Sequence, residues 1–561
     1  MRFGGVLVGA VMALGLMAPV SSAPAAPTTL DRTIVPVGER DFEFGPGEPH
    51  LTRSLGVADP GGIGKPLVGF KMVADHQVVD EESPGRIEYF DTCPGPFESA
   101  YRPQEAATPQ VVDSMMRRLR RIKTGPATGV EFSKVISAGD SADNSQKNET
   151  RWFIRLMDGA TVDPNSGADT FDGFTQAEYS GAWPTETLEL ANEPFDAVGA
   201  RLPWYLVMGN HDELIQGNAV RTDTFQGLVV GDRKVFASVD AYPDCPASPG
   251  EAGAKASIAF VSRGRAVPAD PARKFLVPEQ VIKQYFKTSG KPVGHGFNRA
   301  PDDPLGEGPA AYYAFPLHKK VRAIAIDSPP RHFGDAGVLD DPQYGWLERK
   351  LTRFSKTYYD EEGELVSNPD ARNKLVVILS HHTSATIRNP GTNPAAMPYH
   401  CFETTDVPQS EGTCADGEGL KELFLRFPNV IAWVNGHEHE NEVRAWESPD
   451  PADPSRAFWE ITTAGHVDWP QQSRLIEIAW LPGAVGDTAV IYGTIVDHAA
   501  PLAPDPAMQS TVKYLASLAR AESYYDACVL ATEGAQTCNG PGTSQDRNVR
   551  LLTAVPFDIG T

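Results

Sequence analysis

The sequence predicts an α/β fold in which two β-sheets pack on each other. Short, largely apolar runs alternate with helix-like segments over much of the chain, which is the pattern of a parallel sheet. Further strand-like runs follow residue 440, and we expect them to form a second sheet packed on the first. Polar motifs come directly after the apolar runs, so ligands should bind at the carboxyl ends of the strands.

The first 25 residues have the composition of a secretory signal peptide. Arg2 precedes an interrupted apolar stretch, and cleavage after Ala25 places small residues at Ala23 and Ala25. The alternative, a membrane anchor, is disfavoured because the stretch is shorter than the roughly 20 residues that a spanning helix needs. We therefore expect a secreted, extracytoplasmic protein without a stable membrane anchor.

Strands and helices can be assigned in chain order. A helix is expected at 109–123, with Thr108 as N-cap and Pro109 in its first turn, and another at 149–157. A helix near 346–354 and one over 508–526 follow later. Strands are expected at 67–74, 135–138, 204–208, 311–315, 321–327, 375–379, 430–434, 458–463, 474–480 and 488–492.

These elements suggest one large domain with additions. We assign residues 67–500 to the catalytic domain and read the irregular, Pro- and Gly-rich stretch 213–310 as an insertion or cap. Residues 26–66 are an N-terminal extension. Residues 501–561 are a helical, disulfide-containing C-terminal extension.

Six cysteines in an exported chain indicate three disulfides. We favour the pairs that are close in sequence and flanked by loop residues, with the remaining two cysteines as a long-range pair. A cysteine nucleophile is the alternative. The expected pairs are Cys401 with Cys414, Cys528 with Cys538, and Cys93 with Cys245.

The charge balance limits the partners. With 73 acidic and 50 basic residues the net charge is −23, which repels polyanions at long range. Nucleic acid is therefore not an expected partner. A local basic pocket can still bind a single phosphate.

Five polar motifs follow apolar runs. They supply carboxylate, amide and imidazole groups and no thiolate, a mixture that suits Mn, Fe, Ni or Zn in a catalytic site. Their residues are Asp75-His76-Gln77, 139–143, 209–212, Ser380-His381-His382 and 436–439.

Strand alternation selects among the residues of the first and last motifs. In an extended chain Asp75 and Gln77 point the same way and His76 points away, so Gln77 is the expected ligand. The same alternation places His437 and His439 on one side.

The middle motifs complete the predicted cluster. Asp140 follows a strand and a glycine and can bridge two cations with its two oxygens. Asn210 adds a neutral oxygen and His381 an imidazole. His382 is the competing ligand in its motif, with a supporting hydrogen bond or a substrate contact as its alternative role.

The order of these motifs resembles that of the calcineurin-like metallophosphoesterase superfamily, in a secreted bacterial branch with Gln in the first motif. The resemblance covers residues 67–500 and implies a four-layer α-β-β-α sandwich of two mixed β-sheets flanked by helices. It also implies two divalent or trivalent ions, with Mn, Fe or Zn expected. The implied ligands are Asp75, Gln77, Asp140 and His439 for one ion, and Asp140, Asn210, His381 and His437 for the other.

Four residues acquire expected roles from this resemblance or its departures, and Arg86, in the loop after the first strand, is considered with them. His211 stands where the family has a general acid or phosphate-contacting histidine, and Asp212 is expected to orient it. Gln77 replaces a histidine, which favours Mn or Fe over Zn. Asp143 replaces the tyrosine of purple acid phosphatases and is expected to be a supporting acid. Arg86 is either a phosphate contact or a solvated loop arginine in a local ion pair.

The resemblance implies hydrolysis of a small phosphate monoester or diester by a hydroxide that bridges the two metals, with His211 protonating the leaving group. The alternative is a non-catalytic secreted protein that binds metal or serves in cell-surface interaction. The sequence does not specify the oligomeric state.

Overall fold

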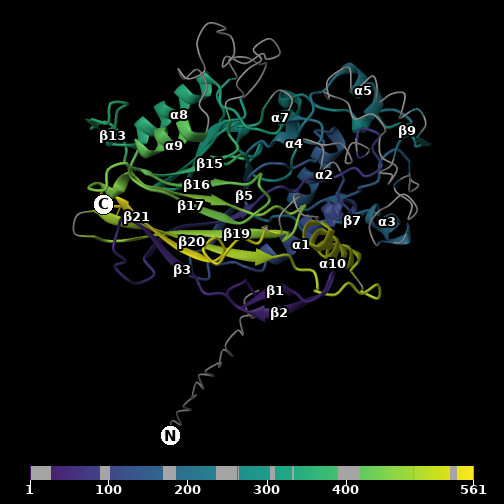
Figure 1. Ribbon diagram of the computed structural model, residues 1–561, viewed down its shortest axis with the longest axis horizontal. Helices are drawn as coiled ribbons and strands as arrows, with labels where there is room; N and C mark the ends of the chain where they lie inside the picture. Colours follow the sequence, from purple (N-terminus) through teal and green to yellow (C-terminus); the bar gives the residue numbers. More distant parts are fainter. Residues whose placement is uncertain are drawn as a thin grey trace.

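Two mixed β-sheets packed face to face, with helices on both outer sides, form the molecule (Figure 1). The structure is a computed structural model. It describes residues 1, 27–86, 88, 101–168, 173, 183, 185–235, 262, 264–302, 310–330, 334–388, 417–483, 486–508, 510–530, 538 and 540–559. The predicted sandwich of two mixed sheets flanked by helices is confirmed.

The larger sheet has seven strands. In spatial order they are β3 (Leu51–Leu55), β21 (Val549–Val555), β20 (Asp487–Asp497), β19 (Gln472–Leu481), β4 (Lys65–Val73), β5 (Phe132–Ser137) and β8 (Trp204–Leu206). The last three are parallel, whereas β19 is antiparallel to both β4 and β20. β3 and β21 come from the two segments that we interpreted as extensions, so both segments contribute to this sheet.

The smaller sheet has six strands. In spatial order they are β11 (Tyr313–His318), β12 (Val321–Ala325), β15 (Leu375–Leu379), β16 (Val430–Asn435), β18 (Phe458–Thr462) and β17 (Glu442–Trp446). The four central strands are parallel and the two edge strands antiparallel.

One sequence-based expectation about the sheets is wrong. We expected the runs after residue 440 to build the second sheet, but only β17 and β18 join it, whereas β19 and β20 pair beside β4. The strands of the motifs are likewise divided between the two sheets. A local apolar pattern identifies a strand but carries no information about its pairing partner.

Helices cover both outer faces. α8 (Asp341–Phe354) and α9 (Gly417–Leu425) lie on the smaller sheet, and α1 (Thr108–Leu119), α2 (Lys147–Asp158) and α10 (Thr511–Tyr524) lie on the side of the larger one (Figure 1). Thr108 is not the N-cap as predicted, because α1 already begins there. Its hydroxyl instead accepts a hydrogen bond from the Val79 N–H at 3.1 Å.

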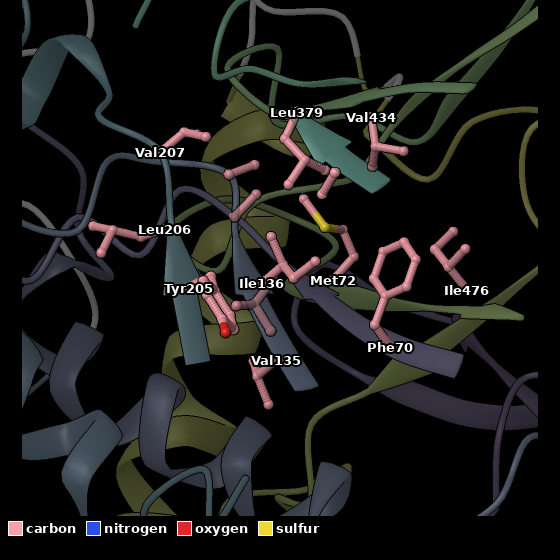
Figure 2. Packing of buried hydrophobic residues seen from close by; sticks show 14 of the residues in the cluster. Phe70, Met72, Val135, Ile136, Tyr205, Leu206, Val207, Leu379, Val434 and Ile476 are labelled. Atoms are coloured by element: carbon pink, nitrogen blue, oxygen red, sulfur yellow. The ribbon is translucent and has the colours of Figure 1, made fainter. Parts of the chain in front are cut away.

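Apolar side chains from both sheets meet in the main core. Phe70 and Met72 of β4 lie near Leu379 and Val434 of the smaller sheet (Figure 2). Within β15, alternate residues face opposite ways: Val377 and Leu379 belong to this core, and Val376 and Ile378 pack under α8 and α9. Burial of such side chains contributes about 1.5–3 kcal/mol each. The strand that precedes the fourth motif is thereby held from both sides.

Shorter elements decorate this framework. Within the described part of the predicted cap, α7 (Pro278–Tyr285) packs against α2 and α4 (Asn210–Glu213). The helical elements are α3 (Thr185–Ala191), α4 (Asn210–Glu213), α5 (Asp223–Val229), α7 (Pro278–Tyr285), η2 (Glu105–Ala107), η3 (Pro271–Arg273), η4 (Phe297–Arg299), η8 (Pro454–Arg456) and η9 (Tyr525–Leu530). The two-stranded sheets are β1 (Arg32–Pro36) with β2 (Phe42–Pro46), β6 (Thr161–Val162) with β7 (Phe195–Asp196), β9 (Arg233–Lys234) with β10 (Arg265–Ala266), and β13 (Thr357–Tyr359) with β14 (Leu365–Ser367).

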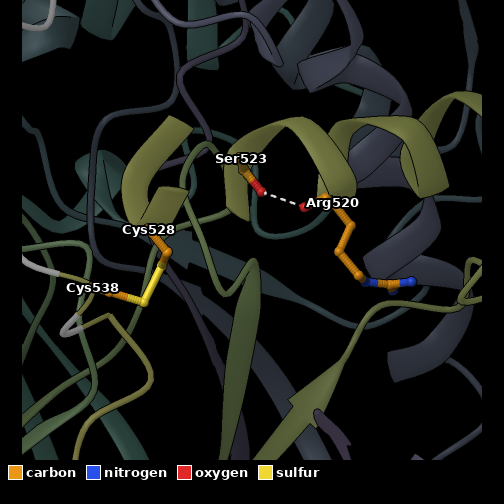
Figure 3. Close-up of a disulfide and its surroundings, with 4 residues drawn as sticks. All are labelled: Arg520, Ser523, Cys528 and Cys538. Carbon is orange, nitrogen blue, oxygen red and sulfur yellow. Dashed lines mark hydrogen bonds between the residues drawn. A yellow bond between two sulfur atoms is a disulfide. The ribbon is translucent and has the colours of Figure 1, made fainter. Parts of the chain in front are cut away.

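A disulfide joins Cys528 to Cys538 after α10, as predicted (Figure 3). The cysteines of the other two expected pairs lie outside the described residues. Among the helices that the structure describes, none has the length and apolar character needed to cross a bilayer.

Candidate metal centre

The five polar motifs meet where parallel strands of both sheets end. Three of them follow β4, β5 and β8 of the larger sheet, and two follow β15 and β16 of the smaller one. Backbone hydrogen bonds join the loops within each sheet: the Gln77 N–H donates to the Asp140 carbonyl at 2.8 Å, and the Gly436 N–H to the His381 carbonyl at 3.0 Å. The site therefore lies between the two sheets.

The backbone of the cluster is left-handed where we expected extended chain. The φ angles are 47° at Asp75, 38° at Gln77, 50° at Asp140, 73° at His437 and 55° at His439. β4 ends at Val73, two residues before the first of them. Strand alternation is therefore the wrong reason for the orientation of these side chains. Such strained positions in non-glycine residues concentrate at functional sites.

Three hydrogen-bond acceptors converge at His381. Its Nδ1 lies 2.8 Å from the Ala138 carbonyl, which can only accept, so Nδ1 carries the hydrogen and Nε2 of the neutral ring has a free lone pair. Nε2 faces Asn210 Oδ1 at 2.8 Å and Asp140 Oδ2 at 3.3 Å. The Asn210 NH₂ group is turned away and donates to the Gly217 carbonyl at 3.1 Å. His381 Nε2, Asn210 Oδ1 and Asp140 Oδ2 are all acceptors, and acceptors this close to one another require a positive charge between them.

The pKa of the His381 ring reflects the same need for a positive charge. Burial alone lowers the pKa of His381, but the Asp140 carboxylate overcomes this effect and raises the pKa to about 9. In turn, although burial opposes ionisation, the neighbouring His381 lowers the pKa of Asp140. The position next to His381 Nε2 thus favours a cation, either a proton or a metal ion.

His439 and Asp75 form the second half of the cluster. His439 Nδ1 donates to Asp468 Oδ2 at 2.6 Å, and its Nε2 lies 3.6 Å from Asp75 Oδ1. Burial lowers the pKa of His439, whereas Asp75 and Asp468 raise it, to about 10 overall. Ligand atoms of Asp75, Asp140 and His439 all lie within 4.8 Å of one another. These oxygen and imidazole donors fit Mn, Fe or Zn.

His437 connects the two halves. Its Nδ1 lies 3.2 Å from His381 Nε2, and its backbone N–H donates to Asp75 Oδ1 at 3.1 Å. Burial and the neighbouring His382 hold its pKa well below the ordinary value, so the ring is neutral. A neutral imidazole is the form that binds a metal.

His382 belongs to the same histidine group but has its ring nitrogens occupied. Ligand atoms of His381, His382 and His437 lie within 4.8 Å of one another. However, His382 Nε2 donates to the Asp335 carbonyl at 2.8 Å, and Nδ1 lies 2.9 Å from Ser328 Oγ. This arrangement agrees with the supporting role that we considered for His382.

His76 and Gln77 lie on opposite sides of their loop. His76 turns away from the cluster and bonds His466 Nδ1 at 2.8 Å through its own Nδ1. Gln77 faces the cluster with its amide nitrogen, 3.4 Å from Asp140 Oδ2, because its carbonyl oxygen accepts from Arg102 at 3.0 Å. Ligation through that oxygen requires a half-turn of the amide.

His211 lies at the edge of the cluster, held by Asp143. Its Nδ1 donates to the Asp143 carbonyl at 2.7 Å, and its Nε2 lies 3.9 Å from Asp140 Oδ2. Burial lowers the pKa of His211, but the carboxylates of Asp140 and Asp143 raise it above the ordinary value. The two carboxylates therefore favour the imidazolium form of this ring.

Asp212 does not have the orienting role that we expected. Its Oδ1 accepts from the Ser141 and Ala142 N–H groups at 3.0 and 3.3 Å, and its Oδ2 accepts from the Gly209 N–H at 3.0 Å. The side chain thus ties the second motif to the third. Asp143, two positions beyond Ser141, contacts the His211 ring instead.

Arg86 forms ion pairs, as one of its two expected roles requires, but it is buried and not solvated. It is 1% exposed and forms ion pairs with Glu88 at 3.1 Å, with Glu105 at 2.5 Å, and with Asp143. These pairs raise its pKa well above the ordinary value despite burial. Arg86 therefore supports the site indirectly, because it fixes Asp143.

Two functional positions escaped the sequence analysis, Arg102 and Asp468. Arg102 holds Gln77 and pairs with Asp468 at 3.2 Å, and Asp468 holds His439. Asp468 lies six residues beyond the end of β18, so it does not come directly after an apolar run as the other motifs do. Arg102 stands in no such pattern either.

Two solved structures are similar to this chain at low sequence identity. The sequence matches no protein-family model and no curated protein. Among solved structures, it is similar to a dimetal phosphatase from Danio rerio with 13% identity and a TM-score of 0.32, covering 77% of this chain and 99% of that one. It is also similar to PhoD, with 11% identity and a TM-score of 0.30, covering 87% of this chain and 82% of that one. Both scores are too low to assign a function.

Proposed function

We propose that this chain is a binuclear metal-dependent phosphoesterase of the calcineurin-like type that hydrolyses small phosphate monoesters or diesters. The observation that supports it most is the convergence of His381 Nε2, Asn210 Oδ1 and Asp140 Oδ2 on one position. These atoms repel one another unless a cation lies between them. Asp75 and His439 offer a second set of donors on the other side of Asp140.

Asp140 would belong to both of the proposed ligand sets. When bound, two ions would make water more acidic and neutralise charge on the phosphoryl oxygens. Gln77 would join through its carbonyl oxygen after its amide turns. The sets are Asp75, Gln77, Asp140 and His439 for one ion, and Asp140, Asn210, His381 and His437 for the other.

His211 is the proposed general acid. Asp143 holds the Nδ1 hydrogen, so the proton to be transferred is on Nε2, the nitrogen on the Asp140 side of the ring. The carboxylates of Asp140 and Asp143 raise the pKa of the ring and so favour the protonated form, which can donate to the leaving oxygen. Arg86 maintains this geometry by fixing Asp143.

An extracytoplasmic location is part of the proposal. The disulfide between Cys528 and Cys538 supports it, because disulfides persist in oxidising compartments. The signal-like composition of residues 1–25 agrees with the same location.

The test is hydrolysis of p-nitrophenyl phosphate and bis-p-nitrophenyl phosphate by protein stripped with a chelator and then supplied with Mn²⁺, Fe²⁺ or Zn²⁺. We expect activity only with metal, and its loss in Asp140→Ala. His211→Ala should retain the ions but lose about 10²–10⁴-fold in kcat, the usual contribution of a general acid.

Asp163→Ala is the matched control, because Asp163 is an exposed carboxylate outside the cluster. Its activity should equal that of the wild type. The ester that is hydrolysed faster decides between a monoesterase and a diesterase. Tight metal binding without turnover on either ester would contradict the proposal and favour the non-catalytic alternative.

A further inference from the structure

Seven basic side chains gather at the edge of the smaller sheet where β12 and β15 begin. We name this set the basic edge. It combines one residue of β5, the turn between β11 and β12, the start of β12, the end of α8 and the residues before β15. Its members are Lys134, Lys319, Lys320, Arg322, Arg353, Arg372 and Lys374.

Backbone contacts hold these segments together. The Leu375 N–H donates to the Lys320 carbonyl at 2.9 Å, and the Arg372 N–H to the Arg353 carbonyl at 3.2 Å. The Lys134 ammonium reaches the Leu317 carbonyl at 3.3 Å. Residues far apart in the sequence therefore form one continuous surface.

The basic edge is not neutralised within the described part of the chain. None of its members forms an ion pair there, whereas other partly exposed arginines, such as Arg426 and Arg444, do. Burial and the neighbouring cations Arg372 and Arg353 lower the pKa of Arg322. Burial and neighbouring cations, with Arg322 having the largest effect among them, also lower the pKa of Lys374. Such local positive charge is unusual in a chain whose net charge is −23.

The basic edge and the candidate metal centre lie at opposite ends of the same strands. β15 runs over five residues from Leu375 to Leu379, and His381 is the second residue after its end. At about 3.3 Å per residue, the strand separates its two ends by roughly 17 Å. A small ester in the metal centre therefore does not touch the basic edge.

We propose that the basic edge binds an extended polyanion, specifically a polymer that carries phosphate groups along its chain. Arginine and lysine together suit phosphate oxygens, since arginine binds them in a bidentate manner and lysine as a point charge. A bilayer surface fits less well, because none of the large exposed apolar side chains belongs to the segments of the basic edge. The inference does not depend on the proposed function.

The probe is fluorescently labelled inorganic polyphosphate, whose binding is followed by anisotropy at several salt concentrations. A chelator is present throughout, so that binding through ions in the metal centre does not contribute. The wild type should bind, with an affinity that falls as salt rises. Charge reversal of three exposed members of the basic edge should weaken binding at least tenfold: Lys319→Glu, Arg353→Glu and Arg372→Glu.

The control reverses three exposed cations elsewhere and produces the same net charge: Arg233→Glu, Lys283→Glu and Lys287→Glu. It should lose much less affinity than the first variant. Circular dichroism melts establish that both proteins fold. Equal losses in the two variants, or no binding by the wild type at low salt, would overturn the proposal. Binding to phosphatidylglycerol vesicles but not to polyphosphate would also overturn it and assign a lipid surface instead.

Discussion

At the scale of single residues, the chemistry of the candidate site depends on partners that fix the rings of its histidines. Ala138 fixes His381 and Asp468 fixes His439, each through Nδ1, so both rings direct Nε2 into the cluster. The sequence located the histidines because each follows an apolar run. Their partners are a backbone carbonyl and a carboxylate outside the five motifs, and no local sequence pattern predicts either contact.

Asp468 offers a direct test of this view. In Asp468→Asn the side chain keeps its size but loses the negative charge that supports His439. Loss of such a partner typically weakens metal binding 10–100-fold. We expect this decrease for one of two ions in isothermal titration with Mn²⁺. The control Asp163→Asn removes an exposed carboxylate and should bind both ions as the wild type does; unchanged binding by Asp468→Asn would refute a role for this residue.

At the scale of elements, the sequence predicted where strands end better than it predicted how the chain continues. β4, β5, β15 and β16 all lie close to their expected positions, because apolar runs of this length are well-defined signals. The residues that follow adopt left-handed backbone, for example at Asp75 and His437. That conformation results from packing of loops between the two sheets, which a single sequence does not display.

The contact of β4 with α1 predicts a dependence of stability on pH. The Lys71 ammonium donates to the Leu119 carbonyl at 2.6 Å, yet burial, with a contribution from Lys123, lowers its pKa to about 7. Unfolding restores the ordinary value of 10.5, so between these two pH values the unfolded chain binds one proton more than the folded one. As the pH rises across that interval, this lysine therefore increases the free energy of unfolding by about 1.4 kcal/mol per pH unit.

Lys71→Met removes this titration. Below pH 7 the variant should be more stable than the wild type by a few kcal/mol, reduced by the loss of the Leu119 hydrogen bond. The difference should shrink as pH rises towards 10. Urea unfolding at pH 6, 8 and 9.5 measures it, with Lys65→Met, an exposed lysine of the same strand, as the control. A constant difference between variant and wild type over this range would contradict the assignment.

At the scale of the whole molecule, the candidate centre joins the two sheets. Asp75, Asp140 and Asn210 follow strands of the larger sheet, whereas His381, His437 and His439 follow strands of the smaller one. The order of these residues could be predicted from the sequence, but the sheet that each of them follows could not. Sheet pairing depends on contacts between segments far apart in the chain. The ends of the chain illustrate the same limit, since β3 and β21 pair with each other across almost the full length of the sequence.

A site shared between sheets predicts that metal ions stabilise the whole fold. Any ligand that binds only the folded state at 100 times its Kd adds about 2.7 kcal/mol. For a chain of 561 residues this corresponds to a rise in Tm of roughly 2 °C for each ion. Differential scanning calorimetry with Mn²⁺ should show this rise in the wild type and in Asp163→Ala, but not in Asp140→Ala, because Asp140 contacts both halves of the cluster. An equal rise in Asp140→Ala would mean that the ions bind elsewhere, and that the left-handed loops between the sheets do not form the metal site.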